Sequence, residues 1–146
     1  MTKKPTSTDD FDLENYDLAA LADAGAELAL KAPHNGAPLV VAGEPVVICM
    51  IGSDSEARRK AERVMLDRNI KARQSGGLTA DDIDNSTVEL LTACTTGWRN
   101  MRMGGEVLPY SPKNAVMVYR RFRWIREQAD AFCSDRANFM KASLPH

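Results

Sequence analysis

The sequence predicts an α+β fold, in which a small N-terminal antiparallel sheet of two or three strands precedes a mainly helical region of about four helices. Between residues 26 and 52, short apolar runs alternate with turn sequences, as in paired strands. After residue 53, apolar residues recur at helical spacing behind residues that cap helix starts. The 146 residues, 44% of them hydrophobic, suit one domain with a modest core.

Three parts are expected along the chain. Residues 1–25 are predicted to be a mobile N-terminal tail, because the first 15 are polar and acidic and residues 16–24 make at most a short helical turn. Residues 26–146 are predicted to form a single α+β domain. Within it, residues 26–52 are the β-hairpin region and residues 53–142 the helical region.

The β-hairpin region contains one strong strand and two weaker ones. Asn35-Gly36 favours a hairpin turn, because this pair readily adopts positive φ angles. Residues 27–31 alternate before the turn, and residues 39–41 form a short apolar run after it. Residues 46–51 are rich in β-branched side chains and make the best strand in the sequence. A sheet this small needs helices on one of its faces.

Two helices are expected next. Ser53 and Glu56 fit a capping box, and the helix that they start runs to about residue 72. Its crowded basic side is interpreted as a solvated face, with a phosphate-binding patch as the alternative. Thr79 caps the second helix, whose apolar stripe extends to Trp98. Gly97 is predicted to end this helix and to leave Trp98 folded back on the core.

The C-terminal segment holds most of the aromatic residues, which usually mark a core or an interface. Gly104-Gly105 predicts a turn. Ser111 and Pro112 predict a helix start, because serine caps the first amides and proline suits the first helical position. A break near Arg121 separates this helix from a last one over about 123–142. The apolar stripe of that last helix serves the core or accepts a partner helix.

Composition and charge exclude several classes of protein. The net charge of −1 gives no overall attraction to nucleic acid or to an anionic membrane. No apolar run approaches the roughly 20 residues that span a bilayer, and the N-terminus lacks a signal-peptide pattern. We therefore expect a cytoplasmic protein. Cys49, Cys94 and Cys133 form no CxxC pair, so we expect reduced, buried thiols instead of a disulfide framework or a zinc site.

The sequence contains no catalytic constellation, and we expect a protein without enzymatic activity. It has no Ser/His/Asp or Cys/His arrangement and no metal-ligand spacing. His34, the one internal histidine, falls in a predicted turn and is expected to face water. We accordingly expect neither a cofactor nor a metal.

Large side chains in the C-terminal segment exceed what one helix stripe needs, and this favours a partner-binding site. Residues 119–126 also interleave arginines with aromatic residues, as single-strand nucleic-acid binders do, although the slightly acidic net charge opposes that alternative. The candidate partner-binding residues are Trp98, Tyr110, Phe122, Trp124, Phe132, Phe139 and Met140.

Several short motifs in this segment carry a resemblance to a known family: Gly97-Trp98, Gly104-Gly105, Leu108-Pro109-Tyr110-Ser111, Trp124 to Gln128 and Asp135 to Phe139. In this order they resemble the tail assembly chaperones of long-tailed bacteriophages (siphoviruses) and of prophages. With the strand and charged helix around Gly52 to Ser55, the resemblance covers roughly residues 26–142. The chain departs from the family in having Arg99 and Arg102, where the family has an acidic residue after the tryptophan.

The resemblance implies a non-enzymatic role in virion morphogenesis. Tail assembly chaperones bind the long, helical, aggregation-prone tape measure protein and keep it soluble while tail tube subunits polymerise around it. Tape measure protein and tail tube protein are the implied partners, together with a longer frameshifted form of the chain itself in many members. The implied location is the host bacterial cytoplasm, and the protein is expected to be absent from the mature virion. The alternatives are a structural head–tail connector or tail completion protein, and a small nucleic-acid-binding module.

Overall fold

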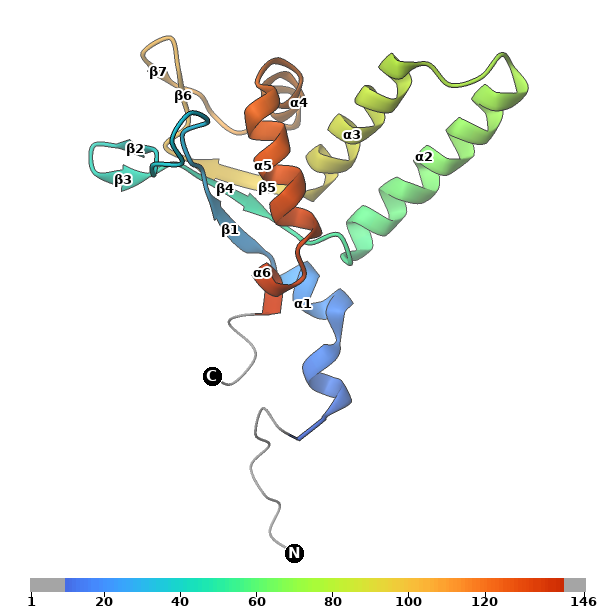
Figure 1. Cartoon of the computed structure of the whole chain (residues 1–146), viewed down its shortest axis with the longest axis horizontal. Coiled ribbons are helices and arrows are strands. Elements are labelled where there is room, and N and C mark those ends of the chain that lie inside the picture. Colours follow the sequence, from blue (N-terminus) through green and yellow to red (C-terminus); the bar gives the residue numbers. More distant parts are fainter. Residues whose placement is uncertain (1–9, 141–146) are drawn as a thin grey trace, which may run out of the picture.

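A computed structural model describes residues 10–140 of the chain. This part contains one three-stranded antiparallel sheet, two small β-hairpins and six α-helices, so the predicted α+β class is confirmed (Figure 1). The helices outnumber the four expected, because the N-terminal segment folds into one helix and the last predicted helix is divided in two.

The central sheet has the strand order β1-β4-β5. β4 corresponds to the strongest predicted strand and lies in the middle, where Ile48 is opposite Leu28 on one side and Trp98 on the other. The third strand therefore comes from outside the predicted β-hairpin region. The bounds are Ala26–Ala29 for β1, Val47–Met50 for β4 and Thr95–Arg99 for β5.

Three helices pack on one face of this sheet: α3 (Ala80–Cys94), α4 (Pro112–Arg121) and α5 (Arg123–Ser134). Ile48 and Met50 point to that face and are 0% and 1% exposed. Burial of each such side chain contributes about 1.5–3 kcal/mol, so apolar packing fixes these helices on the sheet. On the opposite face, Arg99 and Glu27 form an exposed ion pair at 2.6 Å.

Two short hairpins lie at the end of the sheet that is farther from α2, at the left of Figure 1. The first joins β2 (Val40–Val41) to β3 (Glu44–Pro45), and the second joins β6 (Arg102–Met103) to β7 (Glu106–Val107). The predicted Gly104-Gly105 turn is confirmed: these glycines have φ angles of 61° and 81°, which other residues rarely adopt.

A long helical hairpin projects from the sheet at the right of Figure 1. It consists of α2 (Glu56–Gln74), the loop 75–79 and α3. The predicted start of α3 is confirmed, because Thr79 and Asp82 form a capping box. The predicted cap of α2 is wrong by two residues: the side chain of Ser55, not that of Ser53, accepts a hydrogen bond from the amide of Arg58. Both serines fit the local sequence, and only Ser55 is buried.

The prediction that α3 continues to Gly97 and Trp98 is wrong. α3 ends at Cys94, and the next five residues form β5 along the edge of β4. Gly97 lies within the strand opposite Cys49 and does not cap a helix. Pairing with β4 satisfies the backbone amides and carbonyls of this segment, and a sequence pattern within α3 carries no sign of that distant partner.

The predicted start of α4 is confirmed by the hydrogen bond from the amide of Asn114 to the side chain of Ser111 at 3.0 Å. The predicted break near Arg121 is also present, and Phe122 separates α4 from α5. The single last helix expected over 123–142 is instead interrupted at Asp135, and α6 spans Ala137–Met140. Residues 141 and 142 lie outside the described residues.

The N-terminal segment from Leu18 onwards belongs to the packed body, which differs from the mobile tail expected over residues 1–25. A 3₁₀ turn, η1 (Leu13–Tyr16), precedes α1 (Leu18–Ala24), and Asp17 caps α1. Ala22 is 3% exposed, and its carbonyl accepts a hydrogen bond from the Gly52 amide at 3.0 Å. Residues 1–9 of the predicted tail lie outside the described residues.

Candidate functional site

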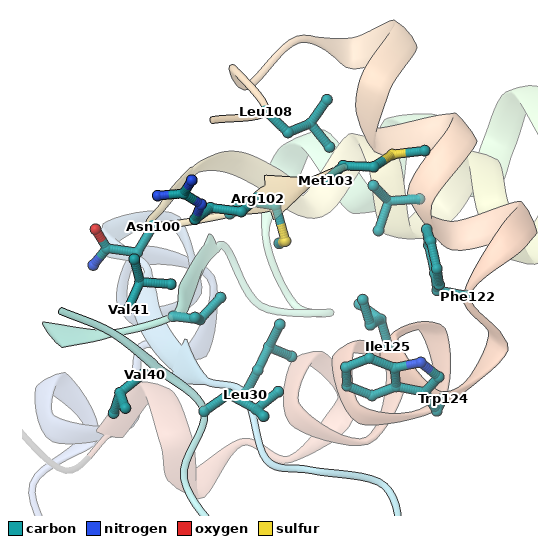
Figure 2. A pocket seen from close by; sticks show the side chains of 14 residues that line it. Leu30, Val40, Val41, Asn100, Arg102, Met103, Leu108, Phe122, Trp124 and Ile125 are labelled. Atoms are coloured by element: carbon teal, nitrogen blue, oxygen red, sulfur yellow. The ribbon is translucent and has the colours of Figure 1, made fainter. Parts of the chain in front are cut away.

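An open apolar cavity of about 250 Å³ lies between the small hairpins and the junction of α4 and α5. In Figure 2 the side chains of Phe122, Trp124 and Ile125 stand on one side, and those of Leu30 and Val41 face them across the space. The lining is almost entirely apolar and consists of Leu30, Leu39, Val40, Val41, Val46, Asn100, Met101, Arg102, Met103, Leu108, Val118, Phe122, Trp124 and Ile125.

The break between α4 and α5 places the two aromatic side chains on this cavity. Phe122 is the C-cap of α4 and the N-cap of α5, with φ −110° and ψ 82°. Ile125, one turn further, is 5% exposed and anchors the start of α5 in the core. Phe122 and Trp124 remain half-buried and packed against the core, so each keeps part of its surface open to the cavity.

The opposite side of α5 is fixed to the segment that follows β1. The side-chain amide of Gln128 donates to the carbonyl of Lys31 at 2.7 Å and accepts from its amide at 3.0 Å. This two-point contact holds α5 at a set distance from Leu30, which lies next to Lys31 and lines the cavity. The width of the cavity therefore depends on long-range contacts and not on the aromatic residues alone.

Polar groups near the cavity are mostly basic. The guanidinium of Arg102 donates to the carbonyl of Gly105 across the β6–β7 turn. The guanidinium of Arg121 lies 5.3 Å from the ring centroid of Phe122, within cation–π range. Arg123 is exposed between the two aromatic lining residues. Asn100 is held by a hydrogen bond to the carbonyl of Pro45 at 2.8 Å.

Two of the predicted partner-binding residues, Trp98 and Tyr110, do not line this cavity and face one another. Their rings meet edge to face at 5.2 Å between centroids. The indole of Trp98 donates to the carbonyl of Leu108 at 2.8 Å, and the hydroxyl of Tyr110 donates to the carbonyl of Thr95 at 2.8 Å. Both polar atoms are therefore used within the chain, where they fix the segment between β7 and α4.

The remaining three predicted residues gather at the other end of α5. Phe132 and Phe139 meet edge to face at 5.6 Å, and Phe139 is only 8% exposed. Phe132 also lines a wide, shallow depression beside β1. Met140 lies near Leu18, in the contact between α6 and α1. The seven predicted residues thus fall into three separate groups, and only Phe122 and Trp124 line the apolar cavity.

Most of the cavity wall was missed from the sequence. Leu39, Val40 and Val41 belong to a predicted short apolar run, and Met103 and Leu108 lie on either side of the predicted Gly104-Gly105 turn, without a predicted role in binding. Val40 is 57% exposed, which is unusual for a valine in a strand. No pattern within residues 39–41 indicates that they meet α4 and α5, because the lining residues of those helices lie 77 to 86 positions later in the sequence.

A buried polar cluster lies beneath the base of α2, away from the cavity. The guanidinium of Arg58 is 3.8 Å from Sγ of Cys94 and 3.7 Å from Sγ of Cys133. A hydrogen bond from Cys133, together with the Arg58 charge, lowers the pKa of the Cys94 thiol to about 7, and the same bond raises the pKa of Cys133. Both thiols are buried, as predicted, so access to reagents is limited, whereas Cys49, which was also expected to be buried, is only half-buried because it points to the open face of the sheet with Arg99.

A second buried pair supports the core. The hydroxyl groups of Tyr119 and Thr95 lie 2.6 Å apart, and burial raises the pKa of Tyr119 far above its ordinary value. Within residues 10–140, no group of three or more His, Cys, Asp or Glu side chains is arranged to hold a metal ion. In the same part of the chain, none of the helices combines the length and apolar character that crossing a bilayer requires.

Comparison with known proteins provides no relative from which a function is transferred: no family model, curated protein or solved structure matches the chain. The apolar cavity, its aromatic wall and the arginines beside it are therefore the features on which a functional interpretation rests.

Proposed function

We propose that the protein is a non-enzymatic phage tail assembly chaperone, and that its cavity receives apolar side chains of a helical partner. The observation that carries the proposal is the open apolar cavity of about 250 Å³ with Phe122 and Trp124 in its wall. A concave apolar surface that remains open in a folded protein is a characteristic of binding sites. The resemblance of residues 26–142 to tail assembly chaperones supplies the choice of partner.

The size of the cavity favours anchoring side chains over a drug-sized ligand. Small-molecule pockets usually measure about 300–1,000 Å³ and combine apolar walls with several convergent polar groups. This cavity is smaller, and its polar lining residues, Asn100 and Arg102, are engaged with carbonyls of the chain. A few leucine- or methionine-sized side chains from one face of an amphipathic helix suit such a site.

The arginines beside the cavity favour a partner with acidic residues next to its apolar face. Arg121 and Arg123 are exposed on either side of Phe122, and Arg102 lines the cavity from the other side. Arginine and aromatic residues together are enriched at the energetic centres of protein interfaces. Under this proposal the tape measure protein presents an acidic amphipathic helix, and the tail tube protein takes its place during assembly.

The test is co-expression with the tape measure protein of the same phage or prophage. Solubility and co-purification of the tape measure protein should require this chain. Trp124→Ala and Phe122→Ala should each weaken co-purification by about tenfold or more, because hot-spot aromatic residues commonly contribute over 2 kcal/mol. Both residues are half-buried, so thermal unfolding of each variant is measured in parallel.

Phe11→Ala is the matched control, because this phenylalanine is 77% exposed, belongs to the N-terminal segment and does not line the cavity. It should leave co-purification unchanged. A tape measure protein that is equally soluble with and without the chain would contradict the chaperone proposal. Detection of the chain in purified virions would favour a head–tail connector or tail completion protein instead.

Nucleic-acid binding receives less support than protein binding. Of the aromatic residues in the stretch 119–126, Tyr119 is 0% exposed and Phe122 and Trp124 pack in the cavity wall. Stacking on bases requires exposed ring faces. Binding of a single-stranded oligonucleotide that falls steeply with salt would reverse this preference.

A further inference from the structure

The α2–α3 hairpin carries large apolar side chains that nothing within the described residues covers. α2 has 19 residues, and none of them is buried. Leu66, Ile70 and Ile83 are 58%, 47% and 59% exposed. The hairpin reaches well beyond the sheet (Figure 1), and the rest of the molecule contacts it at its base and along α3, where Arg120 of α4 binds Asn85. Exposed apolar residues on a projecting helix pair are typical of an interface.

These side chains belong to one side of the hairpin, which we call the groove side. A shallow groove of about 190 Å³ runs between the two helices on that side. Leu66 and Ile70 each follow a groove residue, Met65 and Asn69, by one position. Both are therefore displaced from the groove by about 100° around the axis of α2, in the same direction. The lining is Met65, Asn69, Leu78, Asp82, Ile83, Ser86, Thr87 and Leu90.

The opposite side of the hairpin is occupied by polar contacts and by the body of the protein. Arg68 precedes Asn69 by one position, so it is rotated away from the groove side, and it pairs with Glu89 at 2.5 Å. On that same side, Arg120 of α4 donates to the side chain of Asn85 at 3.0 Å. The body therefore approaches the hairpin from the opposite side and leaves the groove side open.

The two helices carry opposite charges of equal size. α2 has seven basic and three acidic residues, a net charge of +4, whereas α3 has four acidic residues and no basic one, a net charge of −4. A second hairpin of the same sequence is therefore electrostatically complementary to the first, provided that each α2 lies over the partner's α3.

We propose that the groove side pairs with the groove side of a second copy, forming a homodimer through an antiparallel four-helix bundle. A two-fold symmetric interface uses the same patch on both subunits, so one self-complementary face suffices. Helix pairs of this length with an apolar seam and polar flanks pack readily into such bundles. Leu66, Ile70 and Ile83 of each copy form the seam.

The charges also determine the direction of the two-fold axis. An axis perpendicular to the helices would place α2 over the partner's α2 and bring two helices of charge +4 together. An axis parallel to the helices places each α2 over the partner's α3, antiparallel to it. Only the second arrangement juxtaposes opposite charges, and it brings the two 75–79 loops to the same end of the bundle.

The first experiment measures the molar mass of the whole chain in solution by light scattering across a range of protein concentrations. The expected result is a species of about twice the 16.1 kDa of one chain. The double variant Leu66→Gln/Ile83→Gln should weaken dimerisation by at least about tenfold, because it removes apolar surface from the seam of both copies. A wild-type chain that stays monomeric at tens of micromolar overturns the proposal.

Val64→Gln is the matched control for the double variant. Val64 is 59% exposed on the same helix, but it precedes Leu66 by two positions and is rotated by about 200° from it. This substitution should leave the dimer intact. Circular dichroism should give the same helix content for all variants, since none of the changed residues is buried. Loss of the dimer in the Val64 variant alone would contradict the proposal, because it would place the interface on the side of α2 opposite to Leu66.

The second experiment tests the direction of the axis. Ser75 lies in the loop, is exposed and has a φ of −106°, so Ser75→Cys introduces no backbone strain. In a Cys49→Ser background, which removes the half-buried thiol, oxidation should crosslink two copies through their loops. Raising the salt concentration should weaken the dimer, because opposite charges face each other. A dimer that forms no such crosslink and tightens with salt contradicts the proposed arrangement.

Discussion

The sheet body and the α2–α3 hairpin are stabilised in different ways. In the body, Ile48, Val118 and Tyr119 are at most 1% exposed and are contributed by two elements far apart in the sequence, β4 and α4. In the hairpin, α2 buries no residue, and its ends are defined by capping residues and local charge pairs. The body is specified by contacts between distant segments, whereas α2 is specified largely by residues within its own helix; α3 joins the two, because it buries Val88, Leu91 and Cys94 in the core.

This difference relates to function. Residues that fill a core are unavailable to a partner, whereas a helix that buries no residue, such as α2, has its apolar side chains available for one. The proposed binding cavity lies where the body leaves a gap between its own elements, and the proposed dimer interface lies on the hairpin. The two proposals therefore use different surfaces and are tested independently.

The largest expected difference between the two regions comes from the same substitution at two isoleucines. Ile48→Ala should destabilise the protein by about 2–5 kcal/mol, because it leaves a cavity at a residue that is 0% exposed. Ile70→Ala, at a residue that is 47% exposed, should change the free energy of unfolding by less than about 0.5 kcal/mol. Urea unfolding at low protein concentration measures both. Equal effects would contradict the distinction between a packed body and a helix, α2, that buries no residue.

A second pair of substitutions tests the contact of α1 and α6 with the body. A Cβ atom at Gly52 would lie 2.9 Å from Cβ of Ala22 and 3.1 Å from Cδ2 of Phe139, so Gly52→Ala should cost about 1–3 kcal/mol. At Gly97, in the middle of β5, an added Cβ meets nothing within 4 Å. Gly97→Ala should therefore be neutral or slightly stabilising. Thermal unfolding of the two variants measures both effects. A neutral Gly52→Ala would mean that α1 and α6 do not pack here.

The hairpin should respond to the loss of a cap more than to the loss of an exposed apolar side chain. Thr79→Ala removes the acceptor for the amide of Asp82 and should cost about 1 kcal/mol. The effect should be concentrated in faster hydrogen exchange of the first turn of α3. Thr79→Ser retains the hydroxyl and should restore protection. Uniformly faster exchange throughout the body would show that the hairpin and the body unfold as one unit.

The smallest effect is expected at the junction of the two regions, where Arg136 binds the carboxylate of Asp54 at 2.7 Å and 2.9 Å. These hydrogen bonds hold the pKa of Asp54 below its ordinary value of 3.8. The ionised form therefore favours folding: its contribution is complete above pH 3.8 and is lost as pH falls through the lower folded pKa. Asp54→Asn should remove this part of the acid dependence, as measured by unfolding between neutral and strongly acidic pH. An unchanged acid profile in Asp54→Asn would show that the pair contributes nothing.

Local sequence signals gave the correct starts of α3 and α4. Thr79, and Ser111 with Pro112, each act within one turn of their own helix, and the Gly104-Gly105 turn needs only its own φ angles. For α2 the predicted cap was Ser53, whereas the structure has Ser55, because several serines and carboxylates near that site fit the same pattern. Burial of Ser55, which distinguishes the two, is a tertiary property.

The candidate site was predictable only in part. Phe122 and Trp124 were among the predicted partner-binding residues, since large aromatic residues beside a helix break are visible in the sequence. Their opposite wall, including Leu30 and Val41, was not visible, because it comes from segments more than 80 positions away. The other predicted aromatic residues pack against one another or into the core, as Phe139 does at 8% exposure.

The sequence by itself determined the α+β class, the strongest strand, the starts of α3 and α4 and the turn at Gly104-Gly105, because helix caps, turns and apolar periodicity act over a few residues. The tertiary structure alone decided that residues 95–99 form a strand instead of the end of a helix, since the pairing partner β4 lies nearly 50 positions earlier. It also decided which aromatic residues border an open cavity and which side of the hairpin stays uncovered. Both depend on how distant segments pack, and packing of that kind leaves no periodic signal in either segment.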